Sequence, residues 1–207
     1  MIKVKKIKSE VIEENCYAVY DTDTRYAAII DPGVTADPVI NAVESENLKP
    51  EMVINTHGHY DHVLSDDVIR LKYNIPLAVH KDDAEMLADS EKNMSLLWGM
   101  PASIKNPEIL LEDNQKVKLS FTAFKVLSTP GHSRGSVCLL FGSYLFTGDT
   151  LFAGAIGRSD LYGANFEDFI KSLKKLKSLD PSIIICPGHG SMSTLANEIR
   201  HNPFLQS

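Results

Sequence analysis

Cysteine is scarce in this 207-residue chain, and the positions of its three cysteines exclude a disulfide framework. Cys16, Cys138 and Cys186 are far apart and form no CxxC pair, which is typical of buried, reduced thiols in a cytoplasmic protein. A catalytic thiol is the alternative interpretation. Cys186 is its strongest candidate, because it directly precedes a loop that carries a candidate metal ligand.

Excess basic charge and long apolar runs are also missing. The chain has 27 Asp and Glu against 21 Lys and Arg, so its net charge is -6 and the phosphates of a nucleic acid would be repelled. Residues 1–15 alternate charged and apolar side chains and lack the apolar core of a signal peptide. No later run reaches membrane-spanning length. We therefore expect neither nucleic acid nor membrane as a partner, and a cytoplasmic location.

The composition is that of a globular protein, and one domain covering residues 1–207 is the simplest expectation. A chain of this length can bury a large core without disulfides, and its 43% hydrophobic content is near the globular average. Strand-like runs dominate both halves and helical patterns lie between them. This order predicts an α/β fold with helices packed outside the sheets.

The expected strands are short apolar runs bounded by turn residues. They cover residues 15–21, 25–31, 51–55, 75–80, 109–112, 115–120, 122–128, 136–141, 143–147 and 182–186. Helices are expected at 36–47, 62–73, 81–89, 165–179 and 193–201. In the first of them, Asp37 is the expected N-cap and Pro38 the first helical residue. Residues 91–108 break the pattern and predict either an irregular connection or a lid over a pocket.

Histidines are concentrated in the stretch "NTHGHYDH". His57 and His59 are two residues apart, so in extended chain their side chains point to the same side and can hold one ion together. If a helix begins at the tyrosine that follows, Asp61 and His62 lie on its first turn and face a neighbouring ion. One short loop can therefore supply ligands to two metals.

Three further ligand-type residues follow strands later in the chain. His132 comes after the Pro-Gly turn of "STPGHS", Asp149 lies in "FTGDT", and His189 comes after the Pro-Gly turn of "CPGHG". Open α/β sheets place their sites at such strand ends. A single histidine after a strand is more often a turn residue, but five of the seven histidines lie in glycine-containing loops of this kind. His80 and His201 lack this setting and are expected at the surface or behind the ligands.

The ordered set HxHxDH, PGH, GD and PGHG resembles the metallo-β-lactamase superfamily. "LFAGAIGRSDL" and "PGHGSMSTLANEIRHNPFL" are similar to the short glyoxalase II-like hydrolases within it. The resemblance implies an αββα sandwich of two mixed β-sheets, with helices on the outer faces and a dinuclear site at its edge. It implies that His57, His59 and His132 hold one ion, that Asp61, His62 and His189 hold the other, and that Asp149 bridges them.

Nitrogen and oxygen donors of this kind suit two divalent ions, zinc above all, with iron or manganese as alternatives. Two such ions about 3.5–4 Å apart lower the pKa of a shared water toward about 7. We expect Asp61 to be catalytic, because it is placed to orient that water as well as to bind metal. The resemblance implies a thioester hydrolase, and its small-molecule substrate would be a thioester such as S-lactoylglutathione.

The substrate contacts are expected in two segments. Full-length glyoxalase II enzymes continue into a helical domain that contributes to the glutathione site, and this chain is expected to lack it. The pocket would then come from residues 91–108 and from the loop that holds Arg158 and Tyr162. Arg158 either contacts a substrate carboxylate or pairs locally with Asp160, and Tyr162 either contacts substrate or packs.

A second enzyme class also resembles this chain. Persulfide dioxygenases are similar to it and use one iron, whose ligands would be His57, His132 and Asp149 here. Such a facial triad leaves coordination positions open for oxygen. Two metals with thioesterase activity would favour the hydrolase, whereas one iron with oxygen uptake would favour the dioxygenase.

Overall fold

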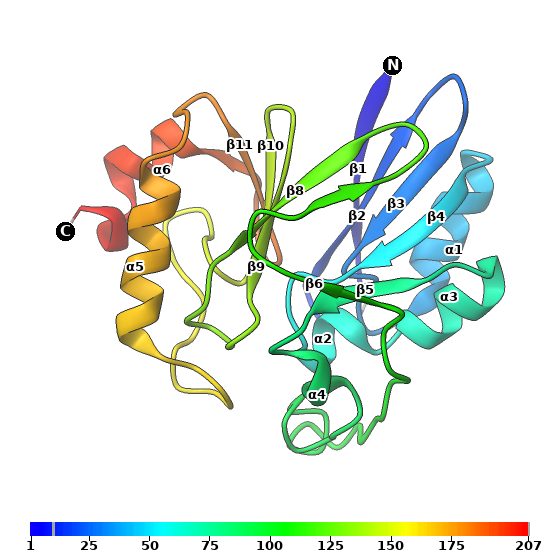
Figure 1. The fold of residues 1–207 in the computed structure, drawn as a ribbon, viewed down its shortest axis with the longest axis horizontal. Helices are drawn as coiled ribbons and strands as arrows, with labels where there is room; N and C mark the ends of the chain where they lie inside the picture. Colours follow the sequence, from blue (N-terminus) through cyan, green and yellow to red (C-terminus); the bar gives the residue numbers. More distant parts are fainter. Residues whose placement is uncertain (10, 207) are drawn as a thin grey trace.

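The computed structural model describes residues 1–9 and 11–206, and its strands form two six-stranded sheets (Figure 1). The first sheet holds, in spatial order, β1 (Ile2–Lys8), β2 (Asn15–Asp21), β3 (Tyr26–Ile30), β4 (Lys49–Ile54), β5 (Leu77–His80) and β6 (Ile109–Leu111). β1 to β3 pair antiparallel, and β3 to β6 pair parallel. This sheet is therefore mixed, and the parallel strands end at one edge.

The second sheet contains the later strands of the chain. Its members are β7 (Lys116–Lys118), β8 (Ala123–Ser128), β9 (Val137–Phe141), β10 (Tyr144–Gly148), β11 (Ile184–Pro187) and β12 (Ser193–Thr194), and neighbours in sequence are also neighbours in the sheet. β10 and β11 pair parallel, whereas the other neighbours pair antiparallel. β10 and β11 thus end side by side.

Helices cover the outer faces of both sheets (Figure 1). α1 (Ala36–Ser45), α2 (Tyr60–Val63), α3 (Asp66–Tyr73) and α4 (Ala84–Leu87) accompany the first sheet. α5 (Phe166–Lys177), α6 (Leu195–His201) and a 3-10 turn (Pro203–Leu205) accompany the second. Among the helices of the described residues, none is long and apolar enough to cross a bilayer.

Both faces of each sheet are apolar, because each sheet packs on helices and on the other sheet. In β3, Ala27 and Ile29 join the cluster beneath the helices, whereas Ala28 and Ile30 join the cluster shared with the second sheet. Phe146 of β10 belongs to that shared cluster, and Leu145 packs with α5. The two-residue period places alternate side chains in different layers. The predicted αββα sandwich is confirmed.

Several predicted boundaries are wrong. Thr35, not Asp37, is the N-cap of α1, so Pro38 lies third in the helix, where its missing N–H still costs no helical hydrogen bond. The helix predicted at 62–73 is two helices, because the chain turns at Ser65, and α4 is a single turn. The sequence patterns missed β1 and β12. β1 is a partly exposed edge strand whose lysines obscure the alternation of its apolar residues.

Residues 91–108 form an irregular segment that is nevertheless anchored. The buried Asn93 side chain donates to the Ala102 carbonyl at 3.2 Å and accepts from the Ser95 N–H at 2.9 Å. Ile104 is buried against the core. Leu97 and Trp98 are exposed at the tip. The segment is therefore held at its base and presents apolar side chains at its surface.

Candidate metal centre

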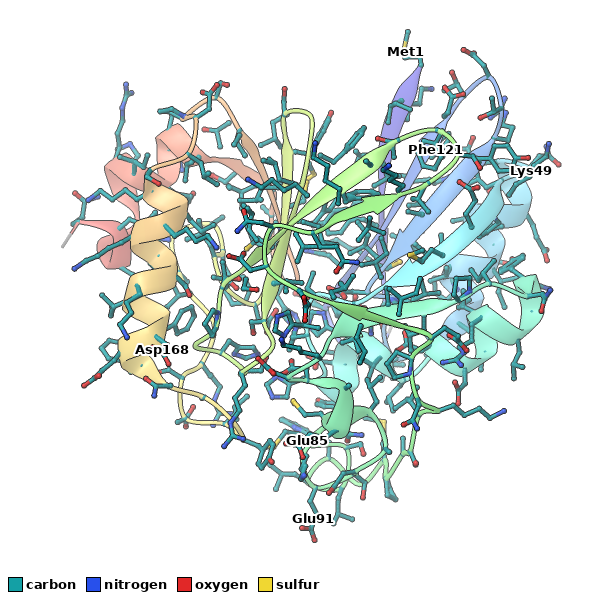
Figure 2. The ribbon with its side chains drawn as sticks, viewed as in Figure 1. Met1, Lys49, Glu85, Glu91, Phe121 and Asp168 are labelled. Atoms are coloured by element: carbon teal, nitrogen blue, oxygen red, sulfur yellow. The ribbon has the colours of Figure 1, made fainter. Side chains whose placement is uncertain are left out.

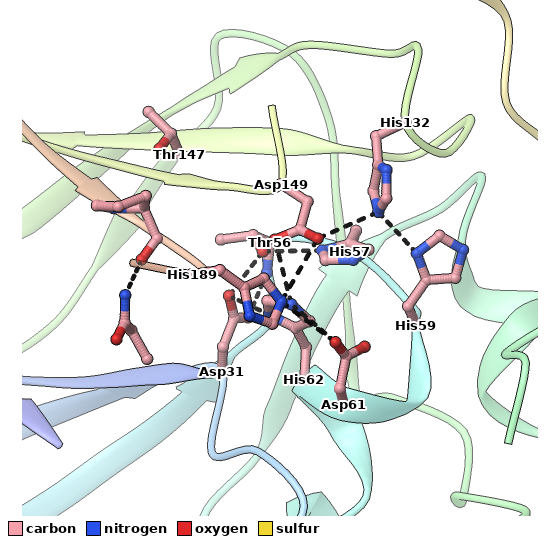
Figure 3. Close-up of polar contacts among 12 residues, drawn as sticks. Asp31, Thr56, His57, His59, Asp61, His62, His132, Thr147, Asp149 and His189 are labelled. Carbon is pink, nitrogen blue, oxygen red and sulfur yellow. Dashed lines mark hydrogen bonds and ion pairs between the residues drawn. The ribbon is translucent and has the colours of Figure 1, made fainter. Parts of the chain in front are cut away.

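The loops that carry the seven predicted ligands meet at one edge of the sandwich (Figure 3). The loop after β4 and the first turn of α2 provide His57, His59, Asp61 and His62, and the loops after β8, β10 and β11 provide His132, Asp149 and His189. Parallel strands end together, so the convergence follows from the pairing of β10 with β11 and from the register of β4 in the first sheet.

The first group of ligand-type atoms belongs to His57, His59 and His132, and these atoms lie within 4.8 Å of one another. His59 Nδ1 is 2.8 Å from His132 Nε2. All three side chains are buried. Two of the residues come from the loop after β4, whereas the third comes from the second sheet. The group is complete only when both sheets are in place.

The second group consists of Asp61, His62 and His189, whose ligand-type atoms also lie within 4.8 Å of one another. Asp61 Oδ2 is 3.2 Å from His189 Nε2 and 3.9 Å from His62 Nε2. α2 begins at Tyr60, as the ligand spacing requires, and so Asp61 and His62 lie on its first turn. This group likewise joins two residues from α2 to one from the second sheet.

Asp149 lies between the two groups. Its Oδ2 atom is 3.6 Å from His132 Nε2 and 3.6 Å from His189 Nε2, while its Oδ1 atom is 3.3 Å from His62 Nε2. The backbone beside it must be glycine, since a Cβ at Gly188 would lie 2.4 Å from Asp149 Oδ1. The carboxylate thus contacts both groups at once, which is the position of a bridging ligand.

Hydrogen bonds to Nδ1 orient the imidazole rings. His132 Nδ1 donates to the Arg158 carbonyl at 2.7 Å, and His189 Nδ1 donates to the Glu13 carbonyl at 2.9 Å. His62 Nδ1 donates to Asp31 Oδ2 at 3.0 Å. A carbonyl only accepts, so Nδ1 carries a proton in the first two rings, and Nε2 is the nitrogen that could bind a metal. Such bonds fix the tautomer and the direction of a metal-binding histidine.

The polar atoms at the centre fit a metal ion. Nε2 of His57, His59 and His62 and Oδ1 of Asp149 are buried, and none of them makes a hydrogen bond to the described residues. Buried polar atoms without a partner cost about 1–3 kcal/mol each. Imidazole nitrogens and carboxylate oxygens are the donors that zinc, iron and manganese accept in proteins. A cation would satisfy all four atoms.

The electrostatics of the site also favour a cation. Burial lowers the pKa of His57 well below its ordinary value, and the neighbouring His62 and His132 lower it further, so this ring is neutral. Burial alone would raise the pKa of Asp149, but His62, followed by His132 and His189, holds that pKa well below its usual range. For His62 the lowering by burial is outweighed by Asp61, Asp149 and Asp31, and its pKa rises well above its ordinary value. The carboxylates therefore create a negative potential at the second group.

Asp31 is a supporting residue that the sequence analysis missed, because it was included only as the last residue of the expected strand 25–31. Its buried carboxylate accepts the Thr56 N–H at 2.8 Å, the Thr56 hydroxyl at 2.7 Å and the His62 ring at 3.0 Å. Because the Thr56 hydroxyl donates its hydrogen bond to Asp31, its oxygen accepts a hydrogen bond from His57 Nδ1 at 3.1 Å. A carboxylate directly after a strand of the same sheet is the signal that would have found it.

Asp83 is the second residue that was missed. It is fully buried at the N-terminus of α4, and it caps no helix amide with its side chain. It accepts the Gly58 N–H at 3.0 Å, the Gly135 N–H at 2.6 Å and the Ser133 hydroxyl at 2.6 Å. Gly58 separates two histidines of the first group, and Ser133 follows the third. Asp83 thus joins the two loops that carry that group.

A cavity of about 280 Å³ opens beside these residues. The predicted ligands on its wall are His59, Asp61, His132, Asp149 and His189, and the apolar side chains are Tyr60, Met94, Trp98, Phe152, Ile156 and Leu161. Residues 91–108 thus contribute Met94 and Trp98 to the wall. A larger surface hollow of about 820 Å³, beside Lys81 and Arg134, contains none of the seven predicted ligands. The smaller cavity is therefore the candidate substrate site.

Arg158 and Tyr162, the two predicted substrate contacts, lie at different positions relative to the cavity. Arg158 lines the cavity, but its guanidinium donates twice to Asp160, at 2.9 Å each, in an exposed pair. Its carbonyl orients His132, so a structural role of this residue is visible. The Tyr162 hydroxyl donates to Glu85 at 3.0 Å. Contact of either side chain with substrate stays a prediction.

The remaining histidines and the candidate thiol lie outside the centre. His80 is buried at the end of β5, 3.3 Å from the Ser128 hydroxyl, which excludes the surface alternative and leaves the predicted position behind the ligands. His201 is exposed on α6. Cys186 is buried between the sheets, and burial raises the pKa of its thiol to about 12, so a thiolate nucleophile is not available there at neutral pH.

The fold and the arrangement of these residues are those of a metal-dependent hydrolase, and the chain belongs to the metallo-beta-lactamase superfamily, whose family model matches residues 11–189. The hydroxyacylglutathione hydrolase GloC of Haemophilus influenzae is 34% identical over 100% of this chain and 99% of its own. The structure of BLEG-1, a B3 metallo-beta-lactamase, is 35% identical with a TM-score of 0.95, covering 99% of this chain and all of that one. ETHE1 from Myxococcus xanthus is 26% identical with a TM-score of 0.81, covering 97% and 83%.

Proposed function

We propose that this protein is a thioester hydrolase of the glyoxalase II type, acting on substrates that resemble S-lactoylglutathione. The observation that carries the proposal is the position of Asp149, whose carboxylate contacts both groups of ligand-type residues beside a partly enclosed cavity. The similarity to GloC along the whole chain supports the thioester class. The superfamily as a whole supports metal-dependent hydrolysis.

We assign two divalent ions to the centre, with zinc as the expected metal and iron or manganese as alternatives. The first ion is assigned to His57, His59 and His132, the second to Asp61, His62 and His189, and Asp149 is assigned to both. Such a pair of ions, when bound, polarises the thioester carbonyl and brings the pKa of water toward about 7.

Asp61 is the catalytic residue in this proposal. Its side chain lines the cavity, and its Oδ2 atom lies 3.2 Å from His189. A carboxylate has two oxygens and several lone pairs, so Asp61 can also accept a hydrogen bond from a water in the cavity and direct it toward the carbonyl. Tyr60 and Trp98 line the same cavity, and their stacked rings place apolar surface next to Asp61.

Metal analysis and a thioester assay on the same preparation test the proposal. Protein purified without added metal should contain close to two ions per chain by mass spectrometry, and it should hydrolyse S-lactoylglutathione. Asp149→Asn should lower kcat/KM at least about 10³-fold, because the shared carboxylate is lost. Asp37→Asn is the matched control, since that carboxylate is exposed in the first turn of α1 and lines no part of the cavity. Unaltered turnover by Asp149→Asn would sink the proposal.

A chromogenic cephalosporin belongs in the same assay, because the chain resembles BLEG-1. Hydrolysis of the cephalosporin without hydrolysis of any thioester would overturn the thioester class and leave a hydrolase of another substrate. Turnover of thioesters with only weak cephalosporin hydrolysis is the expected result.

The persulfide dioxygenase is the second candidate, and the likeness to ETHE1 keeps it open. It would need one iron at His57, His132 and Asp149, of which Asp149 lies 3.6 Å from His132. The second group of Asp61, His62 and His189 supplies the ligands that a dinuclear hydrolase needs, and it is compatible with the dioxygenase as well. One iron per chain, together with oxygen consumption when glutathione persulfide is added, would show that the protein is a dioxygenase and not a hydrolase.

A further inference from the structure

We propose that the preferred acyl group of the substrate is apolar, either aromatic or branched alkyl, and that Trp98 selects it. This inference rests on the proposed thioester hydrolase function and adds the class of acyl group. The residues that carry it line the same cavity as the predicted ligands and belong to the two halves of the chain.

The cavity wall offers apolar surface to the part of the substrate that does not react. Met94 and Trp98 come from the segment after α4, while Phe152, Ile156 and Leu161 come from the loop after β10. A cavity of about 280 Å³ is at the small end for ligand sites, so it suits a compact group next to the scissile bond. Compact apolar groups gain most from such a wall, because they lose contact with water.

The wall has little to offer a charged or hydroxylated acyl group. Arg158 is the only Lys or Arg among the described residues that line the cavity, and its guanidinium is already engaged by Asp160 through two hydrogen bonds of 2.9 Å. A substrate carboxylate would have to displace Asp160. A polar group placed against Trp98 or Leu161 would lose its hydrogen bonds to water without replacement, which is unfavourable.

Trp98 is the most exposed apolar residue of this wall. Its ring stacks on Tyr60 at a centroid distance of 6.1 Å and an interplanar angle of 22°. Tyr60 is buried, whereas Trp98 remains 59% exposed. Tyr60 directly precedes the proposed catalytic Asp61, so the indole is supported by the same turn of α2 that places that carboxylate. An acyl group covering the indole would therefore sit beside the reacting atoms.

The segment holds Trp98 in place. The Tyr60 N–H donates to the Asn93 carbonyl at 2.9 Å, so the segment is tied to the start of α2. Met94 has a φ of 71°, a conformation that a non-glycine residue adopts only when its surroundings fix it. Figure 2 shows Glu85 and Glu91 at the end of the molecule opposite Met1, where this segment projects from the sandwich. A fixed wall selects by shape and polarity.

Thioesters of one thiol with different acyl groups test the proposal. The metal-loaded protein is assayed with S-lactoyl-, S-isovaleryl- and S-benzoylglutathione, and each kcat/KM is divided by the rate at which hydroxide alone hydrolyses that compound. We expect the normalised values of the isovaleryl and benzoyl thioesters to exceed that of the lactoyl thioester about tenfold or more. Trp98→Ala should lower kcat/KM for the benzoyl thioester about tenfold, mainly through KM, and change the lactoyl value less than about twofold.

Two further variants separate selection from folding. Trp98→Phe keeps an aromatic ring on Tyr60 and should retain most of the benzoyl preference. Leu97 is the exposed neighbour of Trp98 and lies outside the cavity. Leu97→Ala should therefore leave kcat/KM unchanged for all three thioesters. Thermal melting of each variant shows whether it is folded.

The outcomes distinguish this inference from the proposed function. Hydrolysis of all three thioesters with no acyl preference, or an equal loss on all of them in Trp98→Ala, overturns the role of Trp98 and leaves the hydrolase intact. Failure of the metal-loaded protein to hydrolyse any thioester overturns both. A benzoyl preference that Trp98→Ala abolishes and Trp98→Phe keeps supports the inference.

Discussion

The carboxylate of Asp83 accepts a hydrogen bond of 3.0 Å from the backbone N–H of Gly58, the residue between His57 and His59. The same buried side chain accepts from Gly135 N–H at 2.6 Å in the loop that carries His132. One carboxylate that binds no predicted ligand directly therefore sets the distance between the two loops of the first group. Contacts of this supporting kind, and the burial of particular residues, can be tested by substitution and by chemical labelling.

Replacing Asp83 should weaken metal binding more than it weakens folding. In Asp83→Asn an amide NH₂ replaces one of the two acceptor oxygens, so the Gly58 and Gly135 N–H groups cannot both be satisfied. We expect the affinity for the first ion to fall about 10–100-fold, which is typical when a residue behind a ligand is changed. Competition with a chromophoric chelator measures it. Asp82→Asn, the exposed neighbour, should keep full affinity, and equal affinities in both variants would contradict this role.

Loss of Asp31 should affect the second ion more than the first, because Asp31 contacts His62 directly and reaches His57 only through the Thr56 hydroxyl. The Asp31 carboxylate fixes the His62 ring at 3.0 Å, and the neutral amide introduced by Asp31→Asn would no longer hold Nδ1–H in the same way. Metal analysis after dialysis should then give about one ion per chain, with kcat/KM reduced about 10–100-fold. Asp37→Asn, exposed in the first turn of α1, should retain the metal content of the unmodified protein. Two tightly held ions in Asp31→Asn would refute the assignment.

Adding one methyl group at Gly188 should disrupt the centre. The Cβ of Gly188→Ala would lie 2.4 Å from Asp149 Oδ1 and 2.6 Å from His62 Cε1, so both must move. We expect activity to fall more than about 100-fold and stability by about 1–3 kcal/mol. Gly142→Ala is the control, because it has φ 53° but open space around it. It should lose some stability in denaturant unfolding and no activity, so equal activities in the two variants would contradict the argument.

Cysteine reagents should leave the folded enzyme active. Burial raises the pKa of Cys138 to about 11 and that of Cys186 to about 12, and a thiol reacts through its thiolate. At pH 8, well below both values, iodoacetamide should modify neither cysteine in the folded protein, whereas all three cysteines should react in denaturant. Mass spectrometry after proteolysis reads the labelling. Rapid inactivation that follows the labelling of Cys186 would show that the thiol takes part in the reaction.

The sequence was sufficient to predict that the seven ligand-type residues lie close together, because they follow apolar strands and parallel strand ends meet. Metal binding by these residues stays a prediction. The sequence was also sufficient for most strands, as in "YAAII" of β3, where a short apolar run between turns is visible without the structure. Both signals are local. The assignment of His132 and His189 to particular ions came instead from the resemblance to the superfamily, because spacing alone does not place them.

What the sequence did not predict depends on contacts between distant segments. Asp83 is 25 residues from Gly58 and 52 from Gly135, and its buried role has no local pattern that separates it from the exposed Asp82. Likewise, Asp31 looks like an ordinary turn residue until His62 is folded against it. The predicted N-cap of α1 was wrong for a local reason. Proline is tolerated anywhere in the first turn of a helix, so Pro38 does not determine where the helix begins.

Each three-residue group draws two members from the loop and helix after β4 and one from the second sheet. In the proposed assignment of two ions, neither half of the chain can therefore assemble a complete coordination sphere during synthesis. An ion cannot template either sheet separately, and tight loading must follow the docking of the two layers. Metal content thus reports on the completed tertiary structure, and a chain stalled with its sheets apart would compete poorly for scarce metal in the cell.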